Sequence, residues 1–127
     1  MKKRLSSGLL AAFFLLGCAH ADITRPGYCE LYGVKDTGAA RQIRSAQALP
    51  QAQIDEKCKR VLAPVGYVVT GCAIVNEDDT IDLFWRAGDK CVEMHERAHA
   101  QCGMTHTERF NYEVRLGHPR PSCPSIG

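Results

Sequence analysis

The sequence predicts a small α+β domain, stapled by disulfides, in which a β-hairpin packs against helices. Three observations lead to this expectation. Besides Cys18, the chain holds an even six cysteines, at positions 29, 58, 72, 91, 102 and 123. Two neighbouring stretches rich in β-branched and aromatic residues flank the polar turn 76–79, which is typical of a hairpin. Directly after them, apolar residues fall at helical spacing between Asp89 and Cys102.

The first 17 residues have the composition of an export signal. A basic start (Lys2, Lys3 and Arg4) precedes the uncharged run Leu9–Leu16, which is too short to cross a bilayer as a helix. Two cleavage sites compete. Leu15-Leu16-Gly17-Cys18 resembles a bacterial lipobox, which would make Cys18 a lipidated first residue attached to a membrane, whereas Ala19-His20-Ala21 favours cleavage after Ala21. We expect an exported domain, residues 22–127, in the periplasm or on the outer membrane as a lipoprotein.

Composition and charge limit the classes of binding partner that the chain is expected to have. The chain carries a formal charge of +2, and removing the three basic residues of the leader leaves 2 − 3 = −1. Because no basic stripe with interleaved aromatics remains, nucleic acid is not expected as a partner. The length allows one domain with one modest core, which we expect to act as a monomer.

The six remaining cysteines predict three disulfides, whose pairing the sequence leaves open among fifteen arrangements. The absence of a C-x-x-C pair argues against a cysteine-based zinc knuckle. Cys91 has a second interpretation as a metal ligand, because it lies on the same helical stripe as two histidines.

The elements before the hairpin are predicted as follows. Asp22–Gly38 is an irregular arm held by Cys29, Ala39–Leu49 is a helix, and Gln51–Leu62 is an amphipathic helix that ends before Pro64.

The hairpin and the elements after it follow from local signals. Tyr67–Val75 and Thr80–Trp85 are the two strands. Asp89 is a plausible N-cap and Gly103 a natural stop for the next helix. Thr107–Leu116 is either a short helix or an extended piece, and Gly117–Gly127 is a tail pinned by Cys123.

The predicted helix carries the strongest functional signal, His95-Glu96-Arg97-Ala98-His99. Residues four apart lie on one face of a helix, so His95 and His99 can offer two imidazole nitrogens to one metal ion. Glu96 projects beside them, where it can take a proton from a metal-bound water. The spacing therefore indicates a zinc hydrolase.

The motif resembles that of the H-E-x-x-H zinc metallopeptidases (zincins), in a small exported bacterial form. Gly103-Met104-Thr105-His106 is similar to the G-x-x-H tail of the metzincin branch, which makes His106 the expected third ligand. Three residues separate His99 from Gly103 where metzincins have two, and no methionine turn follows. Alternative third ligands are Glu108 and Glu113, as in the gluzincin branch, and His118.

The resemblance implies a zinc-dependent metallopeptidase that hydrolyses peptide bonds in the bacterial cell envelope. Its substrate would be a peptide or protein bound along the hairpin as an added strand. His95 and His99 would hold Zn²⁺, and Glu96 would be the general base.

Other residues would support this chemistry. Tyr112 is the preferred donor to the developing oxyanion, with Arg109 and His118 as alternatives. Asp82, Asp89 or a backbone carbonyl would orient the imidazoles. The alternative function is a non-catalytic, disulfide-stabilised envelope lipoprotein with a structural or scavenged metal.

Overall fold

The computed structural model describes residues 27–117. The export signal, Cys18, the cleavage sites, His118 and the tail with Cys123 lie outside these residues. Within them the order of elements is α2 (Tyr28–Leu31), β1 (Ile43–Leu49), α3 (Gln51–Lys57), β2 (Gly71–Val75), β3 (Ile81–Arg86), α4 (Lys90–Cys102) and α5 (Glu108–Arg115). Among the described helices none is long and apolar enough to span a membrane.

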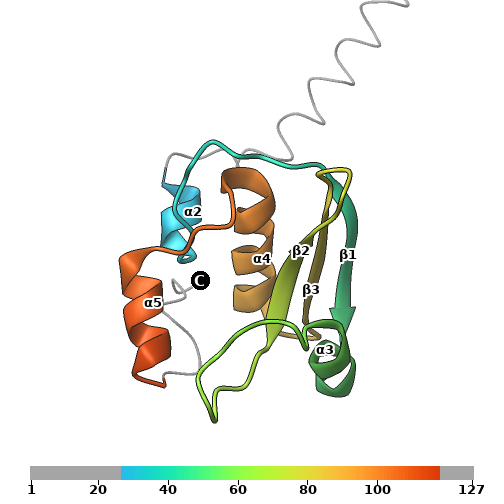
Figure 1. Ribbon diagram of the computed structural model, residues 1–127, viewed down its shortest axis with the longest axis vertical. Coiled ribbons are helices and arrows are strands. Elements are labelled where there is room, and N and C mark those ends of the chain that lie inside the picture. The colour runs from blue at the N-terminus through green and yellow to red at the C-terminus, as the bar shows by residue number, and fades with distance from the viewer. Residues whose placement is uncertain (1–26, 118–127) are drawn as a thin grey trace, which may run out of the picture.

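A three-stranded sheet packs against one face of α4, and α2 packs on the other side of that helix (Figure 1). The strand order is β1-β3-β2, with β1 parallel and β2 antiparallel to the central strand. The hairpin β2–β3 therefore packs against the H-E-x-x-H helix, and the predicted α+β class is confirmed. At the end of α4, a short connection carries the chain to α5, which lies below α2 in this view, on the side of α4 away from the sheet.

The central strand β3 organises the core because both of its faces are covered. Ile81, Leu83 and Trp85 pack with Val92 of α4, whereas Phe84 packs with residues of α3 on the opposite face. Five of its six residues are buried. A strand buried on both faces also needs hydrogen-bond partners along both edges, and β1 and β2 provide them.

The predicted helix over Ala39–Leu49 is wrong, since Ile43–Leu49 is strand β1. This segment is rich in Ala, Gln and Arg, which favour helices. Parallel pairing with β3 overrides that preference, because β1 provides hydrogen-bond partners for the edge of β3 that does not pair with β2. The next predicted helix exists but ends at Lys57, and the first hairpin strand begins at Gly71.

The limits of α4 agree with the sequence prediction. The Asp89 carboxylate accepts a hydrogen bond from the Val92 backbone N–H at 3.3 Å, so Asp89 is the N-cap. Gly103 ends the helix with φ 125°, a conformation almost restricted to glycine. The segment after it forms α5, capped by Thr107, whose side chain accepts from the Phe110 N–H.

Two disulfides join segments that are far apart in the sequence or flank a loop. Cys29 of α2 is bonded to Cys102 at the end of α4, and Cys58 is bonded to Cys72 at the start of β2. Cys91 is disulfide-bonded as well, which removes the alternative that its thiolate binds a metal. These bonds confirm the stapled domain and are compatible with an exported protein.

Candidate metal centre

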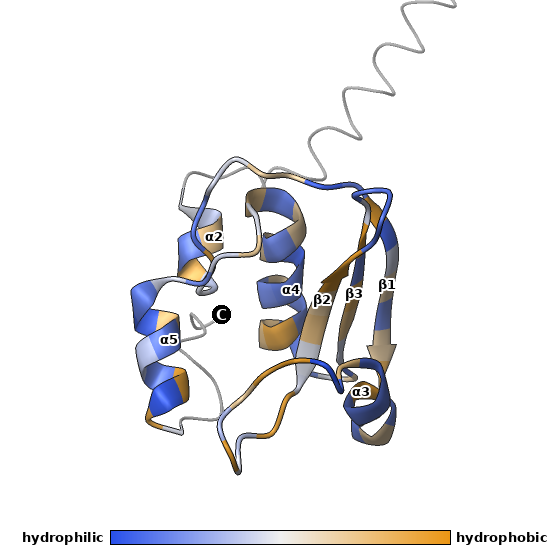
Figure 2. Ribbon diagram, in the orientation of Figure 1, coloured by the Kyte–Doolittle hydropathy of each residue, from blue (hydrophilic) through white to orange (hydrophobic). Residues whose placement is uncertain are grey.

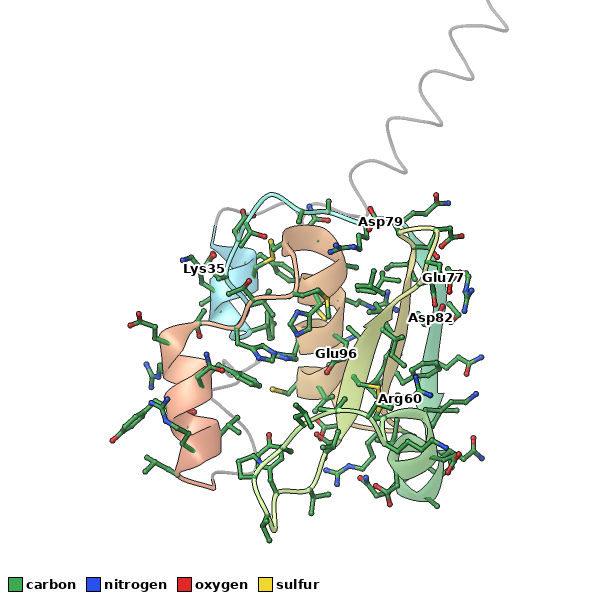
Figure 3. All side chains as sticks on the ribbon, viewed as in Figure 1. Lys35, Arg60, Glu77, Asp79, Asp82 and Glu96 are labelled. Carbon is green, nitrogen blue, oxygen red and sulfur yellow. A yellow bond between two sulfur atoms is a disulfide. The ribbon has the colours of Figure 1, made fainter. Side chains whose placement is uncertain are left out.

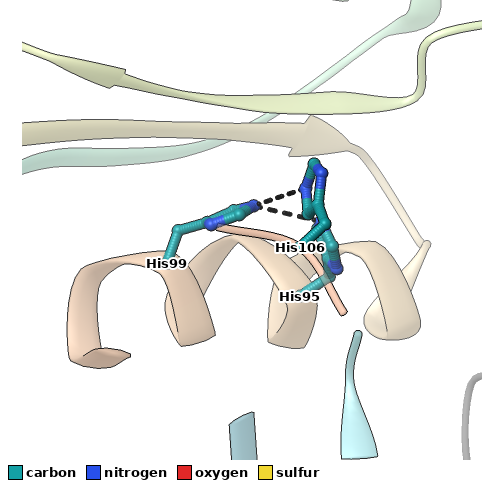
Figure 4. Close-up of side chains that lie close together, drawn as sticks. All are labelled: His95, His99 and His106. Carbon is teal, nitrogen blue, oxygen red and sulfur yellow. Dashed lines mark hydrogen bonds between the residues drawn. The ribbon is translucent and has the colours of Figure 1, made fainter. Parts of the chain in front are cut away.

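Three histidines converge on one point beside α4. The Nε2 atom of His99 lies 3.2 Å from Nε2 of His95 and 3.0 Å from Nε2 of His106 (Figure 4). His95 and His99 lie one helical turn apart on α4, whereas His106 comes from the connection to α5. Ligand atoms of the three residues all lie within 4.8 Å of one another, so the cluster could bind a metal ion.

Backbone pairing brings His106 to the other two histidines. His106 forms an antiparallel bridge with Val34, which is fully buried. On either side of it, the Lys35 N–H donates to the Thr105 carbonyl at 2.8 Å and the Thr107 N–H donates to the Gly33 carbonyl at 2.9 Å. The arm before β1 thus holds the turn after α4 against the helix.

Aromatic stacking fixes the ring planes. Phe110 of α5 stacks on His106 with ring centroids 4.1 Å apart, and on His95 at 4.6 Å. Space for Phe110 depends on Gly33, where a Cβ atom would lie 2.6 Å from the Phe110 ring. The first turn of α5 is therefore packed directly against the cluster.

Hydrogen bonds on the far side of two rings select the tautomer that a metal needs. Nδ1–H of His99 donates to the Gly103 carbonyl at 2.9 Å, and Nδ1–H of His95 donates to the Tyr32 carbonyl. With the proton on Nδ1, the lone pair of each ring is on Nε2 and faces the shared point. Lone pairs that face each other at this distance repel unless a cation or a proton lies between them.

Burial keeps the rings neutral. It lowers the pKa of His95 to about 3, with a further contribution from His99, and it lowers the pKa of His106 to about 4. The pKa of His99 is lowered for the same reason. Neutral imidazoles are the form that binds metal ions.

The spacing fits a small tetrahedral ion. Zinc–nitrogen bonds of about 2.05 Å at tetrahedral angles place two nitrogen ligands about 3.3 Å apart, close to the 3.0 and 3.2 Å in the cluster. Among the described residues the cluster contains no fourth histidine, cysteine or carboxylate. Within this part of the chain, a tetrahedral ion at the cluster would have three protein ligands.

Glu96 lies beside the cluster in a common cavity of about 310 Å³, between α4 and β2 (Figure 3). Its side chain is buried, and burial raises its pKa to about 8. Gly71 of β2 makes room for it, because a Cβ atom there would lie 3.1 Å from Glu96 Oε2 and 2.5 Å from Val92. A cation held by the histidines would favour the ionised carboxylate.

The other predicted site residues lie elsewhere. Tyr112 does not line the cavity and its side chain is 55% exposed, because it is two residues from Phe110 and so points to the opposite side of α5. Glu108 is exposed and Arg109 pairs with Glu113, so these residues are not part of the cluster.

At His95 and His99, the role of orienting the imidazole falls to neither predicted carboxylate. Asp82 accepts hydrogen bonds from Arg44 and Ser45 of β1, and Asp89 caps α4 and pairs with Arg86. Backbone carbonyls have that role instead. Two polar residues that the sequence did not single out, Tyr67 and Asn111, line the cavity. Tyr67 is half-buried, and burial together with the nearby Glu96 charge raises its pKa.

Three comparisons of the chain with known proteins found no similar protein. No protein-family model, no curated protein and no solved structure matches the chain. The interpretation of the site depends on its own geometry.

Proposed function

We propose that the protein is a zinc-dependent metallopeptidase with Glu96 as its general base. One observation supports this most directly. Three neutral imidazoles converge on one point, and a buried carboxylate one residue after the first ligand shares their cavity. A structural metal site has no need of a buried carboxylate that binds neither the metal nor another described side chain.

The residues of the chain would divide the work. When bound, a zinc ion acidifies a water and polarises a carbonyl. His95, His99 and His106 hold the ion, and the Tyr32 and Gly103 carbonyls keep two of the rings in the correct tautomer. Glu96 accepts the proton of the attacking water and passes it to the leaving amine.

Tyr67 replaces Tyr112 as the proposed donor to the oxyanion. Tyr67 lines the cavity, and its pKa is raised by burial and, to a smaller extent, by the charge of Glu96. A hydroxyl there would stabilise negative charge as it develops on the carbonyl oxygen.

The position of β2 favours a peptide as the substrate. In the described sheet β2 is an edge strand, and its residues 71–73 line the cavity next to Glu96. An extended peptide could add to this edge through main-chain hydrogen bonds, which would carry a scissile bond past the histidines. We place the activity in the bacterial cell envelope, where the disulfides would persist.

The test uses the zinc-loaded protein and a library of quenched fluorescent peptides. We expect Glu96→Gln to bind one zinc per chain and to lower kcat by about 10²–10⁴-fold. Glu93→Gln is the matched control, because Glu93 lies one turn earlier on α4 and pairs with Lys90 and Arg97 outside the cavity. Full activity of Glu96→Gln, or a parent protein that takes up zinc and cleaves no peptide, would refute the proposal.

A further inference from the structure

The loop between α3 and β2 is unusually apolar for a surface segment. From Val61 to Cys72 it contains no charged residue. The Cys58–Cys72 disulfide closes it at its base. In Figure 2 it runs along the lower edge of the molecule as a largely hydrophobic ribbon. We call residues 61–69 the apolar loop.

Several side chains of the apolar loop are exposed to water. Leu62 is 98% exposed, Val65 107% and Val68 58%. Exposed apolar surface of this kind, gathered in one segment, is a common mark of a binding site.

One side of the apolar loop faces the candidate metal centre. Five of its residues line the cavity: Val61, Leu62, Ala63, Tyr67 and Val69. Across the cavity lie Phe110 and Val114 of α5 together with Met104. The exposed apolar surface is therefore continuous with the cavity that contains the histidines and Glu96.

The charge of the cavity restricts what it can hold. Among the described residues that line it there is no lysine, arginine or aspartate, and Glu96 is the one carboxylate. This described lining offers no lysine or arginine to pair with an acidic side chain or with the carboxyl terminus of a substrate, and desolvating a charged group against it would be costly. Burial of an apolar side chain would be favourable.

We infer that the apolar loop selects the substrate: it binds a bulky apolar side chain, such as Leu or Phe, next to the scissile bond of an internal peptide segment. This inference rests on the proposed function and adds a substrate class to it. The occupant is a substrate side chain rather than a membrane or a second copy, because the loop residues that line the cavity share it with Glu96 and the histidines.

Leu62 and Val65 offer a matched pair of variants. Both are fully exposed in the same loop, but Leu62 lines the cavity and Val65 does not. Because neither side chain is buried, Leu62→Glu and Val65→Glu should leave the fold intact. We expect Leu62→Glu to lower kcat/KM for a Leu-containing quenched peptide by about 10–100-fold and Val65→Glu to lower it less than threefold.

A binding measurement separates the inference from catalysis. Zinc-loaded Glu96→Gln is titrated with a fluorescein-labelled peptide in which one central residue is Leu, Phe, Glu or Lys. We expect the Leu and Phe peptides to bind at least tenfold more tightly than the Glu and Lys peptides. The double variant Glu96→Gln/Leu62→Glu should bind all four peptides with similar affinity.

The outcomes are distinct. If the parent cleaves Leu, Glu and Lys peptides equally well, the inference is wrong although the proposed function stands. If Leu62→Glu and Val65→Glu weaken cleavage equally, the loop is a general docking surface and the inference is again wrong. Binding of the parent and both variants to phosphatidylglycerol vesicles is measured as well. If both variants lose vesicle binding and cleave the Leu peptide like the parent, the loop binds a membrane and the inference is also wrong. Failure of the parent to cleave any peptide refutes the proposed function itself.

Discussion

Nδ1 of His99 lies 2.9 Å from the carbonyl oxygen of Gly103, the residue that ends the same helix. Cys102, the residue before Gly103, is bonded to Cys29. Three residues after Cys29 lies Tyr32, whose carbonyl accepts a hydrogen bond from His95. One disulfide therefore joins the two segments that orient two of the three imidazoles. Metal affinity and this staple should be coupled.

We predict that Cys29→Ser/Cys102→Ser lowers zinc affinity by about 10–100-fold, the usual effect of losing a partner that orients a ligand. Loop entropy predicts a loss of about 4 kcal/mol in the free energy of unfolding as well. Calorimetric zinc titration and chemical denaturation measure the two effects. The control, Cys58→Ser/Cys72→Ser, should lose about 3 kcal/mol and keep its zinc affinity; equal zinc affinities for both variants would argue against the coupling.

Gly103 should be indispensable for a different reason. A Cβ atom there would meet Thr37 Oγ1 at 2.3 Å, and φ 125° disfavours any other residue. Gly103→Ala should shift the carbonyl that holds His99 and lower zinc affinity at least tenfold. Gly88→Ala also strains a positive φ, but open space surrounds it, so it should cost about 1–2 kcal/mol of stability and no affinity. A Gly103→Ala variant that titrates zinc like the parent would contradict this.

The sequence was a good guide to α4 because every local signal there agrees. Asp89 and Gly103 mark its ends, and the motif spacing places His95 and His99 on one face. His106 was reached by its resemblance to a known tail. Its actual position depends on pairing with Val34, a contact 72 residues away that no local pattern encodes.

Substitution of two tyrosines tests the assignment of the oxyanion donor. Tyr67→Phe should lower kcat by about 10²–10³-fold with little change in KM, since the hydroxyl would act mainly in the transition state. Tyr112→Phe should behave like the parent, because that side chain is outside the cavity. Steady-state kinetics on one peptide is sufficient, and the reverse order of effects would restore Tyr112 as the donor.

Asp82 provides a test of strand β1 that depends on pH. Burial raises its pKa, but hydrogen bonds from Arg44 and Ser45 outweigh this and bring the pKa below its ordinary value. Because the folded-state pKa is lowered, the stabilisation is present above the unfolded pKa of about 3.9 and is lost as the pH falls through the folded value.

Asp82→Asn should therefore cost about 2 kcal/mol at pH 7, with the difference from the parent shrinking towards pH 2. Denaturation midpoints across this range measure it. Zinc affinity should not change, since Asp82 contacts the β1 side chains rather than an imidazole. A large loss of zinc affinity would instead support the sequence-based expectation that Asp82 orients a ligand.

Three features could not be predicted from the sequence, each for a physical reason. Local propensity favours a helix where β1 forms. The segment is a strand because it pairs with the second edge of β3, which is a tertiary effect that local propensity does not contain. Tyr112 was predicted as the donor to the oxyanion, but the direction in which α5 faces is set by Phe110 packing on two histidines. Tyr67 belongs to a loop whose approach to Glu96 depends on how β2 packs against α4.

The central claim is that His95, His99 and His106 hold one zinc ion and leave a position open for water. Zinc K-edge X-ray absorption on the loaded protein tests it most directly. We expect the zinc of the parent protein to have three imidazole nitrogens and one further light-atom ligand at about 2.0–2.1 Å. The spectrum of His106→Ala should show one imidazole ligand fewer, and that of the Glu108→Gln control should match the parent. Sulfur in the first shell, four imidazoles, or a spectrum that His106→Ala leaves unchanged would contradict it.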